Sequence, residues 1–190
     1  MNVGIAIAPK RHEIIAGDAA AHWYENGRAL LCVADGLGHG PLAAHAAQAA
    51  VAAVAELRAE PLERIVVACD QRLTPTRGVA LGLAAIDYAA GYIDYVGVGN
   101  IRALHIGAPH RRFVNGTGIV GAGCGRLFVD RQPLQPGGLL LMYSDGIEEI
   151  MDPRSLLDNR DDPQRMAERL LAELASGRDD ACVLVCHAAP

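Results

Sequence analysis

The apolar periodicity of this chain changes several times along its 190 residues, and this succession limits the possible folds more than any other feature. Alternating or continuous apolar stretches, typical of strands, come first, and apolar residues at helical spacing follow. A run of strand patterns, a further helical segment and a last apolar strand complete the order. This order excludes both a regular β-α-β alternation and an all-β fold.

Strands are predicted in three parts of the chain. Near the N-terminus they cover residues 1–8, 13–18 and 28–35, and the last of these is apolar throughout, which is typical of a strand buried on both faces. The remaining predicted strands cover residues 78–87, 91–97, 102–106, 111–114, 139–143 and 181–187. Residues 116–125 contain five glycines and show neither a helix nor a strand pattern.

Helices are predicted between these groups of strands. Residues 41–58 carry apolar side chains at helical spacing: Leu42, Ala46, Ala50, Val54 and Leu57. Pro41 suits the first helical position, because its missing N–H would have no partner there. A second helix is predicted over residues 61–73 with Leu62, Ile65, Val66 and Cys69 inward, and one or two more between residues 146 and 175. The pattern favours an α+β sandwich of sheets covered outside by helices.

Composition narrows the class of protein. Hydrophobic residues make up 51% of the chain and aromatic residues only 4%, which predicts one compact domain over residues 1–190 with an aliphatic core. The formal net charge of −5 argues against nucleic acid or an anionic membrane as a partner. No apolar run is long enough for a membrane helix, and the first ten residues do not resemble a signal peptide. We therefore expect a cytoplasmic protein.

The cysteines agree with that location. Their number, five, is odd, and no CxxC pair occurs. Cys182 and Cys186 would lie about 13 Å apart on one strand, too far for a disulfide. Reduced thiols are the simplest expectation.

The feature that points to chemistry is a set of aspartates at the starts or ends of predicted strands: Asp18, Asp35, Asp145 and Asp179. Gly36 and Gly146 each follow one of them, and a glycine there lets the backbone turn sharply and expose a carbonyl oxygen. Any one of these aspartates taken alone is better explained as a turn residue or a helix N-cap. The sandwich, however, would bring these strand ends together.

Converging carboxylates repel one another and raise one another's pKa unless positive charge lies between them. Hard divalent cations such as Mg²⁺ or Mn²⁺ prefer oxygen ligands and suit this arrangement. Two such ions held side by side are a common device for phosphoryl chemistry. His39, between two glycines beside Asp35, is a candidate for contact with a substrate phosphate, although a solvent-facing loop residue is an equal alternative. No GxSxG or HExxH motif is present.

The motifs resemble those of the metal-dependent serine/threonine protein phosphatases of the PPM class, especially the bacterial SpoIIE-like branch. The resemblance covers nearly the whole chain, and the motifs follow in the family's order: Gly17-Asp18, VADGLGHG (33–40), RGVALGLAAID (77–87), YVGVGN (95–100), YSDGIEE (143–149) and RDDACVLV (178–185). It implies a four-layer α/β/β/α sandwich, in which two antiparallel sheets are flanked by helices.

The resemblance also assigns roles. Asp35 would bridge two ions, Mn²⁺ or Mg²⁺, and the Gly36 carbonyl would ligate one of them. Asp18 and Asp145 would complete the ligand shells, together with Asp179, which matches the first aspartate of the family's final pair and is preferred to Asp180. The nucleophile would be a metal-activated water, so no side chain is expected to attack phosphorus.

The short chain, without a sensor or regulatory domain, resembles the stand-alone phosphatases of the stressosome. The resemblance implies phosphoserine or phosphothreonine on STAS-domain stressosome proteins as the substrate. Two alternatives stay open: a catalytically silent phosphatase-like binding module, and a metal-dependent phosphohydrolase of small molecules.

Overall fold

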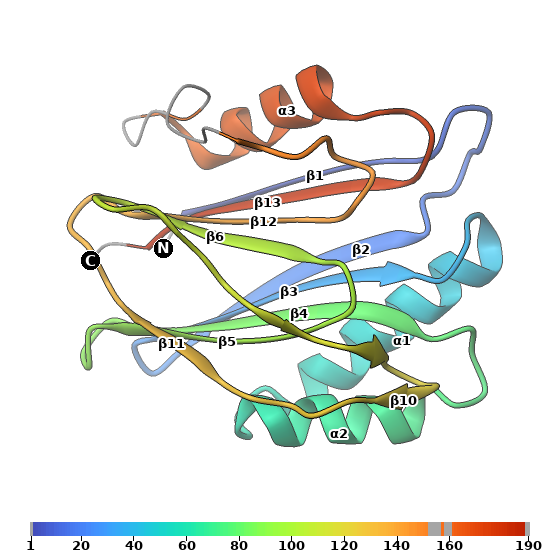
Figure 1. The fold of residues 1–190 in the computed structure, drawn as a ribbon, viewed down its shortest axis with the longest axis horizontal. Helices are drawn as coiled ribbons and strands as arrows, with labels where there is room; N and C mark the ends of the chain where they lie inside the picture. Colours follow the sequence, from blue (N-terminus) through green and yellow to red (C-terminus); the bar gives the residue numbers. More distant parts are fainter. Residues whose placement is uncertain (1, 152–156, 158–160, 189–190) are drawn as a thin grey trace.

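Two β-sheets pack face to face between helices in the computed structural model, which describes residues 2–151, 157 and 161–188 (Figure 1). The first sheet has the order β1-β13-β12-β6-β7, and all its neighbours are antiparallel. Its strands are β1 (Val3–Ala8), β13 (Ala181–His187), β12 (Leu139–Tyr143), β6 (Arg102–Ile106) and β7 (Arg111–Arg112).

The second sheet has the order β11-β5-β4-β3-β2, with the short β8 pairing parallel to β5. Its strands are β2 (Asp18–Glu25), β3 (Arg28–Gly36), β4 (Val79–Asp87), β5 (Tyr92–Val98), β8 (Asn115–Gly116) and β11 (Asp130–Pro133). A separate two-stranded sheet joins β9 (Gly118–Ile119) to β10 (Gly123–Cys124).

Helices cover the outer faces of both sheets. α1 (Pro41–Leu57) and α2 (Leu62–Arg72) lie on the second sheet, and α3 (Pro163–Leu174) lies on the first (Figure 1). The four-layer α/β/β/α prediction is therefore confirmed. Among the described residues, no helix combines the length and the apolar character needed to cross a membrane.

Because side chains alternate between the two faces of each strand, the core consists of three apolar layers: one between the sheets and one under the helices on each side. In β12, Leu140 and Met142 face the space between the sheets, whereas Leu139 and Leu141 face α3. In β3, the odd-numbered positions from 29 to 33 face the first sheet and the even-numbered ones from 30 to 34 face the helices, so this strand is buried on both faces as predicted. Successive side chains on a strand point to opposite faces, so position 35 continues the set that faces the other sheet.

The helix boundaries follow the sequence signals. α1 begins at Pro41 after Gly40, whose φ of 72° lies in the left-handed region. Its buried face is built almost wholly from alanine, which brings the helix close to the sheet, while Leu42 is exposed. α2 buries the four residues predicted to point inward. Of the helical segment predicted between 146 and 175, the structure shows α3, and part of the segment lies outside the described residues.

Two strand predictions were wrong. Residues 13–17 form a loop, and β2 begins at Asp18. The loop packs against the turn before α1, where Gly36 N donates a hydrogen bond to Gly17 O (3.2 Å). The glycine-rich segment 116–125, expected to lack strands, contributes to β8, β9 and β10. Distant contacts hold it: the Asp70 carboxylate of α2 accepts hydrogen bonds from Gly121 N (2.7 Å) and Gly123 N (3.3 Å).

Candidate metal centre

The pairing of β2 with β3 places two of the predicted aspartates side by side. Asp18 is the first residue of β2 and lies directly opposite Asp35 of β3. Cross-strand partners project to the same face of a sheet. Since position 35 belongs to the face that meets the first sheet, both carboxylates lie at the edge of the space between the two sheets.

Ser144 ties this edge to the first sheet. Its hydroxyl donates a hydrogen bond to Asp18 Oδ2 (2.6 Å) and accepts one from Cys182 N (2.8 Å), while Ser144 N donates to Cys182 O (3.1 Å). The end of β12 and the start of β13 are thereby fixed against the start of β2. Asp145, which follows Ser144, and the Asp179–Asp180 pair that precedes β13 are therefore brought to the same edge.

Close approach of the backbone explains the two glycines that follow aspartates. A Cβ added at Gly36 would lie 2.1 Å from Ala43 O in α1, and one added at Gly146 would lie 2.0 Å from Asp180 O. Any side chain at either position would force the backbones apart. The Asp-Gly motifs thus let the loop after β3 meet α1, and the loop after β12 meet the Asp179–Asp180 turn.

The carboxylates shift one another's titration. Burial raises the pKa of Asp35 to about 8, helped by the charges of Asp18, Asp145, Asp179 and Asp180. Burial likewise raises the pKa of Asp18 to about 7, against the lowering effect of its hydrogen bond from Ser144. Burial and then the charge of Asp179 raise the pKa of Asp145. These aspartates therefore lie close enough together for their charges to act on one another, and a cation between them would relieve the repulsion.

Two buried carboxylate oxygens are available to a ligand. Asp18 Oδ1 and Asp180 Oδ2 have no hydrogen-bond partner among the described residues, although both side chains are buried. Buried polar atoms are normally satisfied, so these oxygens fit a site that takes a cation or its water. Among the residues that the structure describes, no group of three or more Asp, Glu, His or Cys side chains is arranged so that it could hold a metal ion without further ligands.

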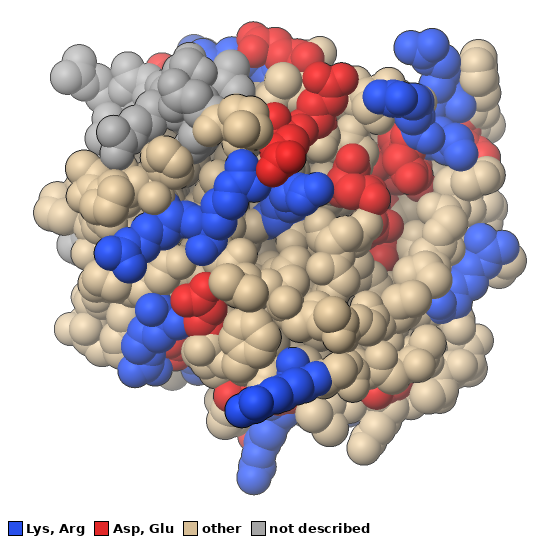
Figure 2. All heavy atoms as spheres, in the orientation of Figure 1, with Lys and Arg blue, Asp and Glu red and all other residues tan. Residues whose placement is uncertain are grey.

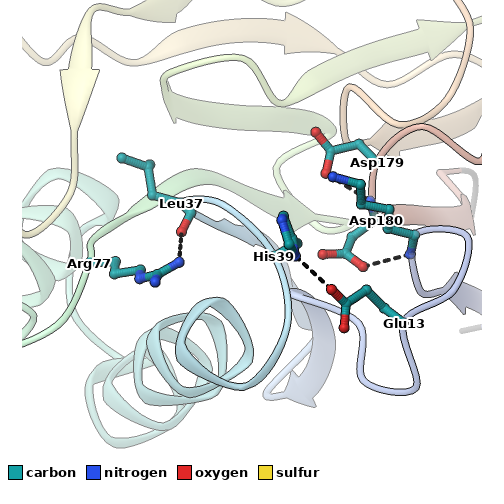
Figure 3. Close-up of polar contacts among 7 residues, drawn as sticks. Glu13, Leu37, His39, Arg77, Asp179 and Asp180 are labelled. Carbon is teal, nitrogen blue, oxygen red and sulfur yellow. Dashed lines mark hydrogen bonds and ion pairs between the residues drawn. The ribbon is translucent and has the colours of Figure 1, made fainter.

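The final aspartate pair divides into two environments. Asp180 is 3% exposed, and its Oδ1 accepts a hydrogen bond from Lys10 N (2.8 Å), which fixes the loop after β1. Asp179 is exposed, and its Oδ1 accepts a hydrogen bond from Asp180 N (3.0 Å). Figure 3 shows both carboxylates near His39. Asp179 therefore faces solvent at the site, whereas Asp180 holds neighbouring backbone.

His39 lies on the rim of the site. Its Nδ1 is 2.8 Å from Glu13 Oε1, and this contact joins the loop after β3 to the loop before β2 (Figure 3). On the other side of the same loop, Arg77 Nη1 donates a long hydrogen bond to Leu37 O (3.5 Å). A substrate role for His39 stays a prediction.

Sequence reasoning missed two residues that orient the aspartates. One is Ser144, described above, and the other is Asn100, whose Nδ2 donates a hydrogen bond to Asp145 Oδ2 (2.7 Å). Both lie within the motifs YSDGIEE and YVGVGN that carried the family resemblance. Ser144 could have been predicted from the sequence because it directly precedes Asp145. Asn100 could not, because only the pairing of β6 with β12 brings it to the site.

All five cysteines are free, as expected from their number and spacing. Burial raises the pKa of Cys32, Cys182 and Cys186, the three thiols in β3 and β13, so these side chains act as neutral core residues. None of them competes with the aspartates as a reactive group.

Comparison with known proteins agrees with the geometry. The model for the family Stage II sporulation protein E (SpoIIE) matches residues 25–189. Phosphoserine phosphatase RsbX of Bacillus subtilis (strain 168) is 24% identical over 173 residues, which cover 90% of this chain and 86% of RsbX. A crystal structure of RsbX in complex with magnesium matches with a TM-score of 0.82 at 22% identity, covering 95% of this chain and 92% of that one.

Two further structures extend the comparison. A chain from a study of the bacterial stressosome, a modular system adapted to control secondary messenger signalling, is 32% identical with a TM-score of 0.92, and the match covers 97% of both chains. The PP2C phosphatase domain of SpoIIE from Bacillus subtilis matches with a TM-score of 0.82 at 21% identity, covering 97% of this chain and 62% of that one. With a family model that matches residues 25–189 and this shared fold, the chain belongs to the SpoIIE family of PP2C-type phosphatase domains.

Proposed function

We propose that this chain is a metal-dependent protein phosphatase that hydrolyses phosphoserine and phosphothreonine. The observation that carries the proposal is the convergence of strand-end carboxylates that raise one another's pKa at a single edge of the sandwich. The proposed ligands are Asp18, Asp35, the Gly36 carbonyl, Asp145 and Asp179. They suit two Mg²⁺ or Mn²⁺ ions, and the magnesium complex of RsbX supports that class of metal.

The chain's own residues prepare the site. Ser144 holds Asp18 with one oxygen turned away from its hydrogen bond, and Asn100 orients Asp145. Asp180 anchors the loop after β1 through Lys10 N, and its other oxygen, Oδ2, which has no partner among the described residues, would accept a hydrogen bond from a metal-bound water. When bound, divalent ions supply Lewis-acid stabilisation of the phosphoryl oxygens and lower the pKa of water to about 7. No side-chain nucleophile is required.

A protein substrate is favoured over a small molecule by the surroundings of the site. Four large apolar side chains are exposed on the loop before β2, on the loop after β3 and at the start of α1: Ile14, Ile15, Leu37 and Leu42. Large exposed apolar side chains on the loops around a site offer contact surface to a protein partner rather than to a small molecule. The similarity to RsbX and to the stressosome structure supports phosphorylated STAS-domain stressosome proteins as substrates and a cytoplasmic location. We propose that residues 1–190 act as one phosphatase domain.

A catalytically silent binding module is disfavoured by the same electrostatics. Without a cation, the raised pKa values mean that the clustered carboxylates destabilise the folded chain. A module that only docks would gain nothing from this repulsion.

The test is turnover of phosphorylated STAS-domain proteins with Mn²⁺, with Mg²⁺ and with a chelator. We expect phosphate release with a metal, its loss with the chelator, and its loss in Asp35→Asn. Asp130→Asn is the matched control, because that carboxylate lies on β11. Turnover that survives the chelator, or that Asp35→Asn leaves intact, contradicts the assignment. Hydrolysis of p-nitrophenyl phosphate without any hydrolysis of phosphoproteins would favour the small-molecule alternative.

A further inference from the structure

A groove of about 200 Å³ opens next to the candidate metal centre, where the chain crosses from the first sheet to the second. It is lined by residues 99–104, which include the start of β6, and by Arg112, Phe113 and Asn115 of the crossing segment. Three hydrogen bonds of the Asn115 side chain hold the crossing segment against the start of β6 and against β5. Its Nδ2 donates to Gly99 O (3.0 Å) and to Ile101 O, and its Oδ1 accepts from Tyr95 Oη (2.9 Å). Phe113 N donates to Ala103 O (2.9 Å), which closes the far wall. The groove is therefore a built feature of the fold.

The groove leads to the metal centre through one residue. Asn100 lines the groove, and its side chain donates a hydrogen bond to Asp145 Oδ2 (2.7 Å). A phosphorylated residue placed at the carboxylates would therefore direct its neighbours in sequence along this groove. Figure 2 shows basic side chains beside acidic ones on the face of the molecule seen in Figure 1.

Two arginines line the groove, and only one of them is paired with an acidic side chain. Arg112 donates to Glu149 Oε1 (2.9 Å) and to Ile150 O (2.9 Å), so its charge is compensated. Arg102 is half-buried, and the described residues give it neither a hydrogen bond nor an ion pair, although its charge lowers the pKa of nearby Asp145 against the larger raising effect of burial. A half-buried guanidinium normally finds an acceptor, because its five N–H donors lose water on burial. Arg102 is thus the group in the groove with spare capacity to bind an anion.

The shape and chemistry of the groove match a carboxylate side chain. Ala103 and Phe113 provide apolar surface for aliphatic carbons, and the planar guanidinium of Arg102 suits a carboxylate through two parallel hydrogen bonds. The phosphate itself belongs at the aspartate cluster, which Asn100 contacts through Asp145.

We propose that Arg102 and this groove select phosphoproteins that carry an acidic residue close to the phosphorylated serine or threonine. The inference rests on the proposed phosphatase function and adds its substrate preference. Arg102 is a specificity-determining residue in this account, and it takes no part in the reaction at phosphorus.

Two phosphoserine peptides of equal length test the proposal, one with aspartates flanking the phosphoserine and one with asparagines in their place. With Mn²⁺, we expect the wild-type protein to have a kcat/KM about tenfold higher for the acidic peptide, mainly through KM. Arg102→Ala should bring this ratio close to one, and Arg102→Glu should favour the neutral peptide. The matched control is Arg111→Ala, an exposed arginine next to Arg112 that does not line the groove, and it should keep the wild-type ratio.

The outcomes separate this inference from the function on which it rests. Turnover of both peptides without preference by the wild-type protein overturns the inference alone. An equal loss for both peptides in Arg102→Ala also overturns it, because Arg102 would then act on the phosphate itself. If the wild-type protein hydrolyses neither peptide, the proposed function fails. Thermal unfolding verifies that each variant is folded. If Arg102→Ala does not fold, Arg102→Gln takes its place.

Discussion

Asp35→Asn should make the metal-free protein more stable while removing its activity. In the folded chain, burial and four neighbouring aspartates raise the pKa of Asp35 from its ordinary 3.8 to about 8. The folded state therefore binds a proton more tightly than the unfolded state does. As the pH rises from 4 towards 8, the unfolded chain releases this proton first, so the free energy of unfolding falls. Above the folded-state pKa, the loss is complete.

The magnitude follows from the size of the shift. One pKa unit corresponds to about 1.4 kcal/mol, so the difference between 3.8 and about 8 sets an upper limit of about 6 kcal/mol. The neighbouring aspartates share the same repulsion, and water reaches the partly exposed edge. We therefore expect Asp35→Asn to raise the free energy of unfolding by about 2 kcal/mol at pH 8 in the presence of a chelator. For a chain of this size, that corresponds to a Tm higher by about 6 °C.

The assay is thermal unfolding of both proteins at pH 5 and pH 8, with chelator and with Mg²⁺. The advantage of Asp35→Asn should shrink at pH 5, and Mg²⁺ should stabilise only the wild-type protein. Asp70→Asn is the contrasting control. Although burial works in the other direction, hydrogen bonds from Gly121 N and Gly123 N lower the pKa of Asp70, so its removal should lower the Tm at pH 8. A Tm for Asp35→Asn at or below that of the metal-free wild type at pH 8 refutes the reasoning.

Three further substitutions probe the parts around the carboxylates. Ser144→Ala leaves Asp18 Oδ2 and Cys182 N without their partner, so the free energy of unfolding in denaturant titrations should fall by about 2 kcal/mol; no change would show that the hydroxyl does not tie the sheets. Gly36→Ala places a Cβ against Ala43 O and should cost at least about 3 kcal/mol by the same measurement, whereas Gly27→Ala meets no atom within 4 Å and should cost only the roughly 1 kcal/mol of its left-handed backbone (φ 77°). Asn100→Ala frees Asp145 and should lower kcat/KM about tenfold while raising the Mn²⁺ concentration needed for half activity; a fall in kcat/KM that leaves this concentration unchanged would argue against positioning of Asp145.

The layers of the fold followed from periodicity because each element carries its own pattern. The continuous apolar run before Asp35 predicted a strand buried on both faces, and β3 has one face on the helices and the other on the first sheet. Pro41 marked the start of α1, and the inward face of α2 was predicted residue by residue. These signals are local, so the sequence alone contains them.

The errors fall where distant contacts decide the structure. Residues 13–17 have enough apolar character for a strand, but Ile14 and Ile15 are exposed, and only Gly17 packs closely, against Ala43 of α1. β9 and β10 are two-residue strands whose segment is held by Asp70 and by a bridge between Val79 and Val120. The edge strand β11 was not predicted; its place is fixed by pairing with β5, where Arg131 Nε donates to Asp94 Oδ1 (2.6 Å).

The site shows the same division. The aspartates could be predicted because an acidic residue next to an apolar run can be recognised in the sequence alone. The roles of Ser144 and Asn100 depend on which strands become neighbours, since β12 pairs with both β6 and β13. The separate tasks of Asp179 and Asp180 depend on the loop after β1, which reaches Asp180 from the other end of the chain.

Binding of Mn²⁺ to the full chain, followed by the loss of free-ion signal in electron paramagnetic resonance, tests the central claim most directly. The account predicts that the wild-type protein takes up about two ions per chain at neutral pH. Asp35→Asn should lose this uptake while remaining folded. Uptake that is equal in both proteins, or absent from the wild type, would contradict the claim that the strand-end aspartates form a metal centre.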